Sequence, residues 1–137
     1  MKVLVVEPRG LPYEKEVPDK LENLQAIVGG HIQAIYPFQD HVALVCNEDG
    51  IGEGLEFNRM IPERQYGGIF GTFFICAIDG ENFASLTPEQ MKTYKKRFHK
   101  AEMILAVNRG NSIIAKVDAI PKHPPDKPKQ PPKAPKR

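Results

Sequence analysis

Apolar residues occur in this chain in two kinds of run, and each kind predicts a different element. Consecutive runs of β-branched and aromatic residues are typical of strands that are buried in a sheet. Apolar residues spaced three and four positions apart are typical of a helix with one buried side. The first kind predicts strands over residues 2–7, 32–36, 42–46 and 69–78, the last of them central, and the alternating residues 13–17 predict an edge strand.

The strongest fold signal lies in residues 29–47. Gly29 and Gly30 are expected to end a helix, because glycine adopts the left-handed conformation of a helix end without a Cβ clash. Only residues 37–41, which include the turn Pro37-Phe38-Gln39-Asp40, separate the two strands that follow this glycine pair. Such a connection is too short for a crossover helix, so the two strands are predicted to pair antiparallel.

Helical spacing occurs first after Pro18. Asp19 is expected to cap the free backbone N–H groups of the first turn of this helix. The predicted buried stripe of the helix consists of Leu21, Leu24, Ile27 and Val28.

A second helix is predicted from Thr87 to about Val107. Thr87 is the expected N-cap, Pro88 occupies the first helical position, and Gln90 completes a capping box. The predicted buried stripe consists of Met91, Tyr94, Phe98, Ala101 and Leu105, and the helix is expected to end at Asn108-Arg109-Gly110.

The remaining segments complete an α+β fold. Residues 55–61 are either a helical turn or an irregular strand, and residues 113–120 are either a linker or a last short strand. We therefore predict a mainly antiparallel sheet of about five strands with two packed helices, in one domain over residues 1–112. From Pro121 onward seven of 17 residues are proline, which predicts a disordered Pro/Lys-rich tail over residues 121–137.

Charge is distributed unevenly along the chain. The net charge is +2, but residues 122–137 hold six Lys or Arg and one acidic residue, so the rest of the chain carries about −3. A body this close to neutral argues against a dedicated DNA-binding domain.

The two cysteines, Cys46 and Cys76, lie in apolar runs and are expected to be buried hydrophobic residues in a reducing compartment. No secretory segment and no membrane-spanning run is found, so we expect a cytoplasmic protein without membrane contact.

Several stretches together resemble a known family. They are Lys2-Val-Leu-Val-Val-Glu-Pro8, Leu24, residues 29–38, residues 42–50, Leu55-x-x-Asn58-Arg59, residues 69–73 and residues 85–90. The set is similar to an uncharacterised family of small proteins from phages, plasmids and conjugative elements of Gram-positive bacteria, known as a domain of unknown function. The resemblance covers residues 1 to about 99 and implies a mobile-element gene and a compact α+β domain. It implies no activity.

No motif for catalysis, metal or cofactor binding is found. The four histidines, His31, His41, His99 and His123, lack the close ligand pairs of zinc sites. The glycine-rich residues 50–54 match neither nucleotide-binding pattern, and neighbouring acids would repel phosphate. Neither cysteine, nor Ser85 or Thr87, lies in a nucleophile motif. We therefore predict no metal, no cofactor and no enzymatic activity.

Asn47, Asn58 and Arg59 are the candidate ligand-binding residues. They stand at strand ends or beside a flexible loop, where ligand sites are often found. The alternative is structural, because Asn side chains commonly bond to nearby backbone groups, and we favour this interpretation.

A basic patch is the second candidate site. Lys92, Lys95, Lys96, Arg97 and Lys100 crowd one predicted helix. A solvated face is the usual interpretation, and a patch for an acidic partner or a nucleic-acid backbone is the functional one. The tail has P-x-x-P frames typical of SH3 ligands, but a solubilising or weakly nucleic-acid-attracting extension is the favoured interpretation.

These observations favour a binding protein over an enzyme. The leading hypothesis is a non-enzymatic accessory protein of a mobile genetic element that engages a host protein or a small ligand, counter-defence being one such role. The alternative is a weak nucleic-acid-binding protein that uses the basic helix face and the tail. The sequence leaves the oligomeric state open.

Overall fold

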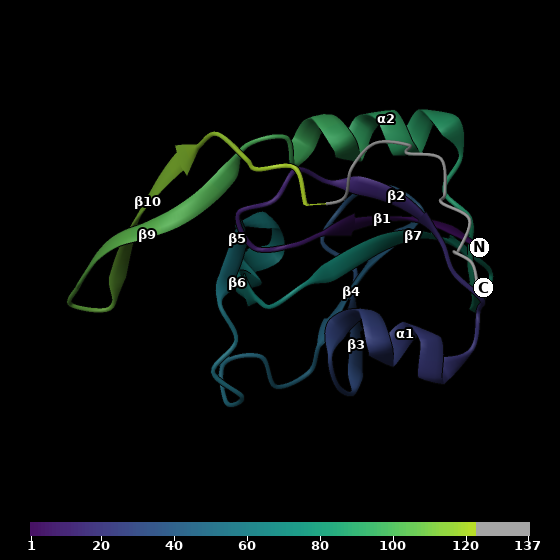
Figure 1. The fold of residues 1–137 in the computed structure, drawn as a ribbon, viewed down its shortest axis with the longest axis horizontal. Coiled ribbons are helices and arrows are strands. Elements are labelled where there is room, and N and C mark those ends of the chain that lie inside the picture. The colour runs from purple at the N-terminus through teal and green to yellow at the C-terminus, as the bar shows by residue number, and fades with distance from the viewer. Residues whose placement is uncertain (123–137) are drawn as a thin grey trace, which may run out of the picture.

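The computed structural model describes residues 1–122, which form an α+β fold as predicted (Figure 1). The helices are α1 (Leu21–Val28) and α2 (Pro88–Arg97), with a short 3-10 turn η1 (Glu63–Gln65). The strands are β1 (Lys2–Val6), β2 (Tyr13–Glu16), β3 (Ile32–Ile35), β4 (Val42–Asn47), β5 (Phe57–Ile61), β6 (Gly67–Phe70), β7 (Phe73–Asp79), β8 (Asn82–Ala84), β9 (Ala101–Asn108) and β10 (Asn111–Val117). Most of the predicted tail, from residue 123, lies outside the described residues.

A six-stranded antiparallel sheet forms the centre of the molecule. Its order is β2-β1-β7-β4-β3, and β8 pairs with β7. Two smaller antiparallel pairs, β5–β6 and β9–β10, complete the described strands. The predicted edge position of residues 13–17, the central position of β7 and the antiparallel pairing of β3 with β4 are confirmed.

One helix covers each face of this sheet, as Figure 1 shows. In β1, Val3 and Val5 pack in the same cluster as Leu24 of α1, whereas Leu4 packs in the cluster that contains Tyr94 of α2. The central strands are therefore buried on both faces. This two-sided burial explains why they appear in the sequence as continuous apolar runs and not as alternating ones.

Helix α1 begins later than predicted. Its N-cap is Lys20, which makes no side-chain cap hydrogen bond, so the predicted Asp19 cap is wrong. The backbone N–H of Lys20 donates to the carbonyl of Pro18, and this tight turn places Asp19 before the cap position. Leu21, at the first helical position, is 57% exposed and does not belong to the buried stripe. The predicted end is confirmed, since Gly29 has φ 77°.

The predicted single strand over residues 69–78 is wrong. The chain leaves β6 after Phe70 and enters β7 at Phe73, and Gly71 between them has φ 92°. A Cβ at Gly71 would lie 2.6 Å from Cδ1 of Leu55. Both the left-handed backbone and the close neighbour require glycine here. Residues 57–61, in the ambiguous segment, form the irregular strand β5, which pairs with β6.

Helix α2 begins as predicted and ends ten residues earlier. The capping box of Thr87 and Gln90 is present, with Pro88 at the start of the helix. The helix stops at Arg97, so the predicted continuation to Val107 is wrong. Ala101 and Leu105, which were predicted on its buried stripe, belong to strand β9.

Strands β9 and β10 form a hairpin in place of the predicted helical extension. Arg109 and Gly110 have φ values of 55° and 83°, so the predicted helix end is a tight hairpin turn. Strand β10 extends through Val117, and residue 112, where the domain was predicted to end, lies within it. Ile120 then pairs with Gly10, which returns the chain to the body. Neither helix within residues 1–122 is long and apolar enough to cross a membrane.

Candidate functional site

Asn58 and Arg59, two of the candidate ligand-binding residues, are fully buried at the start of β5. The Asn58 amide donates to the carbonyls of Val6 and Gly71, both at 2.9 Å. The Arg59 guanidinium donates to Asn58 Oδ1 at 2.9 Å and to the carbonyls of Gly10 and Phe98 at 2.9 and 2.8 Å. We call Asn58, Arg59 and these acceptors the Arg59 cluster.

The Arg59 cluster connects three parts of the chain. Through it, β5 is joined to the turn between β1 and β2 and to the carbonyl at the end of α2. A cation at the last carbonyls of a helix also interacts favourably with the helix dipole. Burial lowers the pKa of Arg59 to about 10, so the side chain still carries its charge at neutral pH. This geometry supports the structural interpretation of Asn58 and Arg59.

Asn47, the third candidate, lies elsewhere at the end of β4. Its amide donates to the carbonyl of Val28 at 3.3 Å and to Glu53 Oε1 at 3.1 Å, and its oxygen accepts from Asp49 N–H at 2.7 Å. The side chain thereby ties the loop after β4 to α1. Asn47 lines an open cavity of about 300 Å³, and the lining of that cavity does not include Arg59. The fold does not gather the three candidates into one site.

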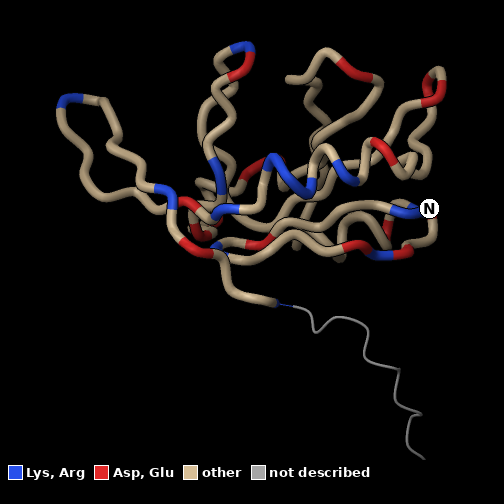
Figure 2. Tube along the Cα trace, turned by 90° about the horizontal axis from the view of Figure 1, so that it is seen from above, with Lys and Arg blue, Asp and Glu red and all other residues tan. Residues whose placement is uncertain are grey.

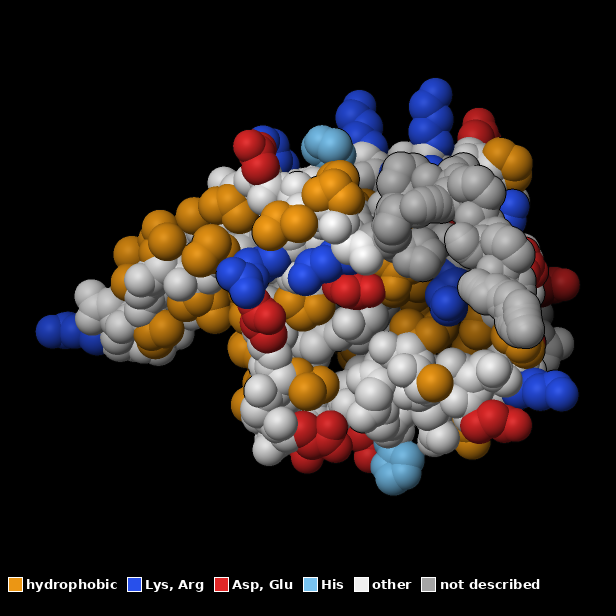
Figure 3. Space-filling view, viewed as in Figure 1, with side chains coloured by type: hydrophobic (Ala, Val, Ile, Leu, Met, Phe, Trp, Pro, Cys, Tyr) orange, Lys and Arg blue, Asp and Glu red, His pale blue; other side chains and the backbone are white. Residues whose placement is uncertain are grey.

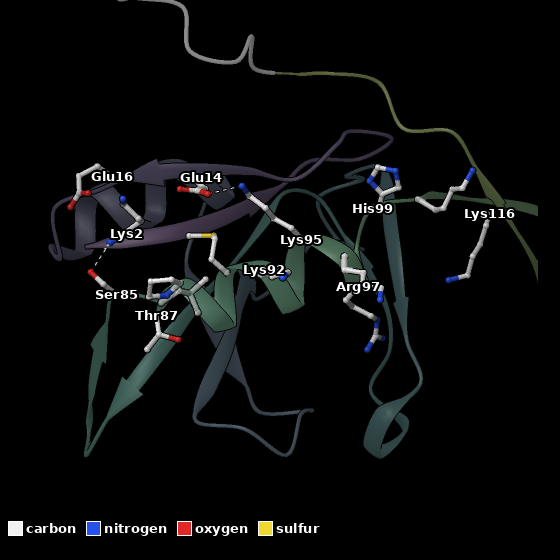
Figure 4. A pocket seen from close by; sticks show the side chains of 15 residues that line it. Lys2, Glu14, Glu16, Ser85, Thr87, Lys92, Lys95, Arg97, His99 and Lys116 are labelled. Carbon is white, nitrogen blue, oxygen red and sulfur yellow. Dashed lines mark hydrogen bonds and ion pairs between the residues drawn. The ribbon is translucent and has the colours of Figure 1, made fainter.

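A large cavity lies between α2 and the β1–β2 hairpin, and we call it the α2 groove (Figure 4). Its volume is about 1010 Å³. All five residues of the predicted basic patch line it, together with Lys2 and Lys116, and the acidic residues of its lining are Glu14 and Glu16. Figure 2 shows the Lys and Arg positions that recur along this part of the molecule.

Four of these seven basic side chains are neutralised within the chain. The ion pairs are Lys95 with Glu14, Arg97 with Glu63, Lys100 with Asp118, and Lys116 with Glu102. Within residues 1–122, Lys2, Lys92 and Lys96 have no ion-pair partner within 4 Å. These three lysines are the ones that can meet an external anion without breaking an existing pair.

Arg97 differs from the other members of the patch. Its guanidinium carbon lies 5.1 Å from the ring centroid of Phe38 and 5.2 Å from that of Phe98. Its two terminal nitrogens donate to the two carboxylate oxygens of Glu63, and this bonding lowers the pKa of Glu63. In Figure 4, Lys95 points toward Glu14 on β2, whereas Arg97 points the opposite way. Arg97 therefore serves to hold η1 against α2.

The wall of the α2 groove also has an apolar part. Leu86 and Met91 are buried side chains that line it, and Pro88 is an exposed one. Sequence reasoning identified the basic face of α2 but missed the contribution of β1 and β2. The alternation of Glu14 and Glu16 around Lys15 was the available signal, because alternate residues of a strand share one face.

Of the thiols and histidines in the described residues, His99 lines the α2 groove and Cys46 lines the cavity beside Asn47. Cys46 and Cys76 are buried and unpaired as disulfides, and burial raises their pKa values to about 11 and about 12. His31, His41 and His99 are exposed, and His123 lies outside the described residues. Among residues 1–122, no group of three or more His, Cys, Asp or Glu could hold a metal ion.

Comparison with known proteins identifies the family of this chain. The model of DUF3846, a domain of unknown function, matches residues 1–99, and the chain belongs to this family. The match ends just after α2, before the β9–β10 hairpin. No curated protein and no solved structure matches the chain.

Proposed function

We propose that this member of the DUF3846 family is a non-enzymatic accessory protein of a mobile genetic element, and that it binds an acidic segment of a host protein in the α2 groove. The mobile-element context comes from the family resemblance. Counter-defence is the role in which a small element-encoded protein most directly benefits from binding a host protein. The observation that carries the proposal is the α2 groove itself.

The lining of the groove fits a peptide segment with both acidic and apolar side chains. Lys2, Lys92 and Lys96 offer three ammonium groups that have no ion-pair partner within residues 1–122, and the exposed Pro88 offers apolar surface beside them. Its volume lies at the upper end of the range for ligand pockets, about 300–1,000 Å³. The positive charge of the groove would speed association with an acidic segment, and apolar contacts buried on binding would supply affinity.

The binding can be measured by fluorescence anisotropy with a labelled peptide that alternates glutamate and leucine. We expect the double variant Lys92→Glu, Lys96→Glu to weaken binding by at least tenfold, since both charges are reversed. The matched control is Lys15→Glu, because Lys15 is exposed on the opposite face of β2 and does not line the groove. Equal weakening by the control, or no binding by the wild type, would contradict the proposal.

A comparative pull-down from host lysate then identifies the natural partner. A specific partner is one that the wild-type chain and Lys15→Glu retain and that the double variant loses. A thermal-shift screen with nucleotides tests the small-ligand alternative, which requires stabilisation by one compound that Lys92→Glu, Lys96→Glu abolishes. Retention of the same proteins by all three chains would contradict a role for the groove.

Weak nucleic-acid binding is the second candidate function, and the three unpaired lysines are the observation that favours it. Three phosphate contacts would give a slope of about −2.7 in a plot of log K against log salt concentration for duplex DNA. Labelled DNA and RNA are titrated with the full chain and with residues 1–122. The difference in affinity gives the contribution of residues 123–137 to binding. Absence of binding at low salt by both chains would exclude this function.

A further inference from the structure

The hairpin of β9 and β10, residues 101–117, projects from the body as an arm (Figure 1). Only its base is anchored there. Ala101 is fully buried, and the carboxylate of Glu102 accepts a hydrogen bond from Met60 N–H at 2.9 Å. The strands β9 and β10 pair only with each other within residues 1–122. An isolated two-stranded hairpin is at best marginally stable in water, so a projecting arm gains from a further packing partner.

The register of the arm gathers apolar side chains on one face. Directly opposed residues of a hairpin share a face, and so do alternate residues along one strand. Ile113, Ala115 and Val117 of β10 therefore share a face with their β9 partners Ala106, Met103 and Ala101. All six residues are apolar, and we call this the apolar face of the arm.

The opposite face of the arm is mixed. It carries Ser112, Ile114 and Lys116 with their partners Val107, Ile104 and Glu102, and Lys116 and Glu102 form an ion pair. A register shift between Ile113 and Ile114 leaves Leu105 as the extra residue of β9. Without this bulge the alternation of β9 would place Met103 and Ala106 on opposite faces. The bulge is therefore what completes the apolar face.

The apolar face is open toward the tip of the arm. Ile113 is 55% exposed, and Met103 on the same face is 39% exposed. In Figure 3 hydrophobic side chains gather along the projecting arm. Contiguous exposed apolar surface of this kind marks an interaction site more often than a random surface does.

We propose that the apolar face of the arm binds the same face of a second copy of this chain, so that two arms pack together across a two-fold axis. The scarcity of charge on the arm is the reason for proposing a second copy of the chain as the partner. Between Met103 and Ala115 the only charged residue is Arg109 at the turn. A symmetric interface places each residue near its own copy, and an uncharged face does so without like-charge repulsion. An acidic protein or a nucleic acid would find no complementary charge here.

The size of the arm determines the expected strength of this dimer. Its strands contain eight and seven residues, fewer than the roughly 20–30 residues a side of a standard interface. An interface of this area belongs to the weak, transient class of about 1,200 Å² or less. The dimer should therefore form in a concentration-dependent manner in the micromolar range and dissociate on dilution.

Sedimentation velocity of the full chain from about 1 to 300 μM tests the proposal. We expect a shift from 15.4 kDa to twice that mass as concentration rises. Ile113→Asp should weaken the dimer by at least tenfold. Val107→Asp is the matched control, because Val107 is an equally exposed aliphatic residue, 67%, on the mixed face. Met103→Asp is the second test variant should Ile113→Asp fail to fold, because Met103 is an exposed residue of the apolar face.

Two results would overturn the proposal. One is a wild-type chain that remains at 15.4 kDa throughout, which would mean that another protein or residues 123–137 cover the apolar face. The other is a dimer that Val107→Asp weakens as much as the variants of Ile113 and Met103 do.

Discussion

Replacement of Arg59 by methionine is the most direct test of how this fold is held together. Methionine is unbranched, apolar and two atoms shorter, so it removes the charge and the donors while it fills part of the same volume. The guanidinium makes three hydrogen bonds to buried acceptors. Hydrogen bonds to charged groups contribute about 1.5–3 kcal/mol each, which gives a gross loss of about 5–9 kcal/mol.

The cost of burying the charge offsets part of this loss. Burial lowers the pKa of Arg59 from 12.5 to about 10, and each pKa unit corresponds to about 1.4 kcal/mol. Roughly 3 kcal/mol is therefore regained when the charge is removed. The net loss in the free energy of unfolding should therefore be about 2–6 kcal/mol. A domain with a free energy of unfolding of about 5–15 kcal/mol would be strongly destabilised.

Urea unfolding followed by circular dichroism measures this loss, since the chain contains no tryptophan. The matched control is Arg64→Met, because Arg64 is exposed and makes none of the hydrogen bonds of Arg59. It should change the free energy of unfolding by less than about 0.5 kcal/mol. Arg59→Lys should recover only part of the loss, since an ammonium cannot reproduce the planar fork of a guanidinium. A loss below 1 kcal/mol in Arg59→Met would refute this account of the Arg59 cluster.

Three further predictions follow from the fold. Gly71→Ala should lower the free energy of unfolding by about 1–3 kcal/mol, because Gly71 has φ 92° and lies close to Leu55. In thermal unfolding this loss should exceed that of Gly80→Ala, where a Cβ meets nothing within 4 Å. Because burial raises the pKa values of Cys46 and Cys76 above 9, the unfolded chain loses thiol protons first, so the free energy of unfolding should fall as pH rises from 8 to 10. The double variant Cys46→Ala, Cys76→Ala should flatten that slope in urea titrations at each pH, and an unchanged slope would contradict the burial of the thiols. Arg97 lowers the pKa of Glu63, so the stabilisation by this ion pair is present above the unfolded pKa of about 4.5 and is lost as pH falls through the lower folded pKa. Glu63→Gln should therefore reduce the loss in the free energy of unfolding between pH 5 and 3 in urea titrations, and an unchanged loss would contradict the role of this pair.

The end of α2 shows where sequence reasoning failed and why. Met91, Tyr94 and Phe98 lie on the buried side of the helix as the spacing indicated, and Ala101 and Leu105 continue the same spacing by chance. At the helix end the carbonyl of Phe98 accepts a hydrogen bond from Arg59, a side chain 39 positions earlier in the chain. Local periodicity contains no information about that contact.

In the candidate sites, too, the sequence showed which residues are polar or charged, and only the fold showed their partners. The basic character of α2 was visible in the sequence, but the ion pairs that neutralise Lys95 and Arg97 come from β2 and η1. The cluster of Asn58 and Arg59 was visible as a polar pair next to a loop, and only packing revealed that its acceptors are the carbonyls of Val6, Gly71, Gly10 and Phe98.

The sequence by itself determined the elements that local chemistry controls: the apolar strands, the glycine end of α1, the capping box of α2 and the antiparallel pairing across a short connection. These depend on backbone conformation and on hydrogen bonds within a few residues. The tertiary structure alone decided where α2 stops, which cations stay unpaired and which face of the arm is apolar. Each of these depends on a partner distant in the chain, whose position exists only after the sheet has formed.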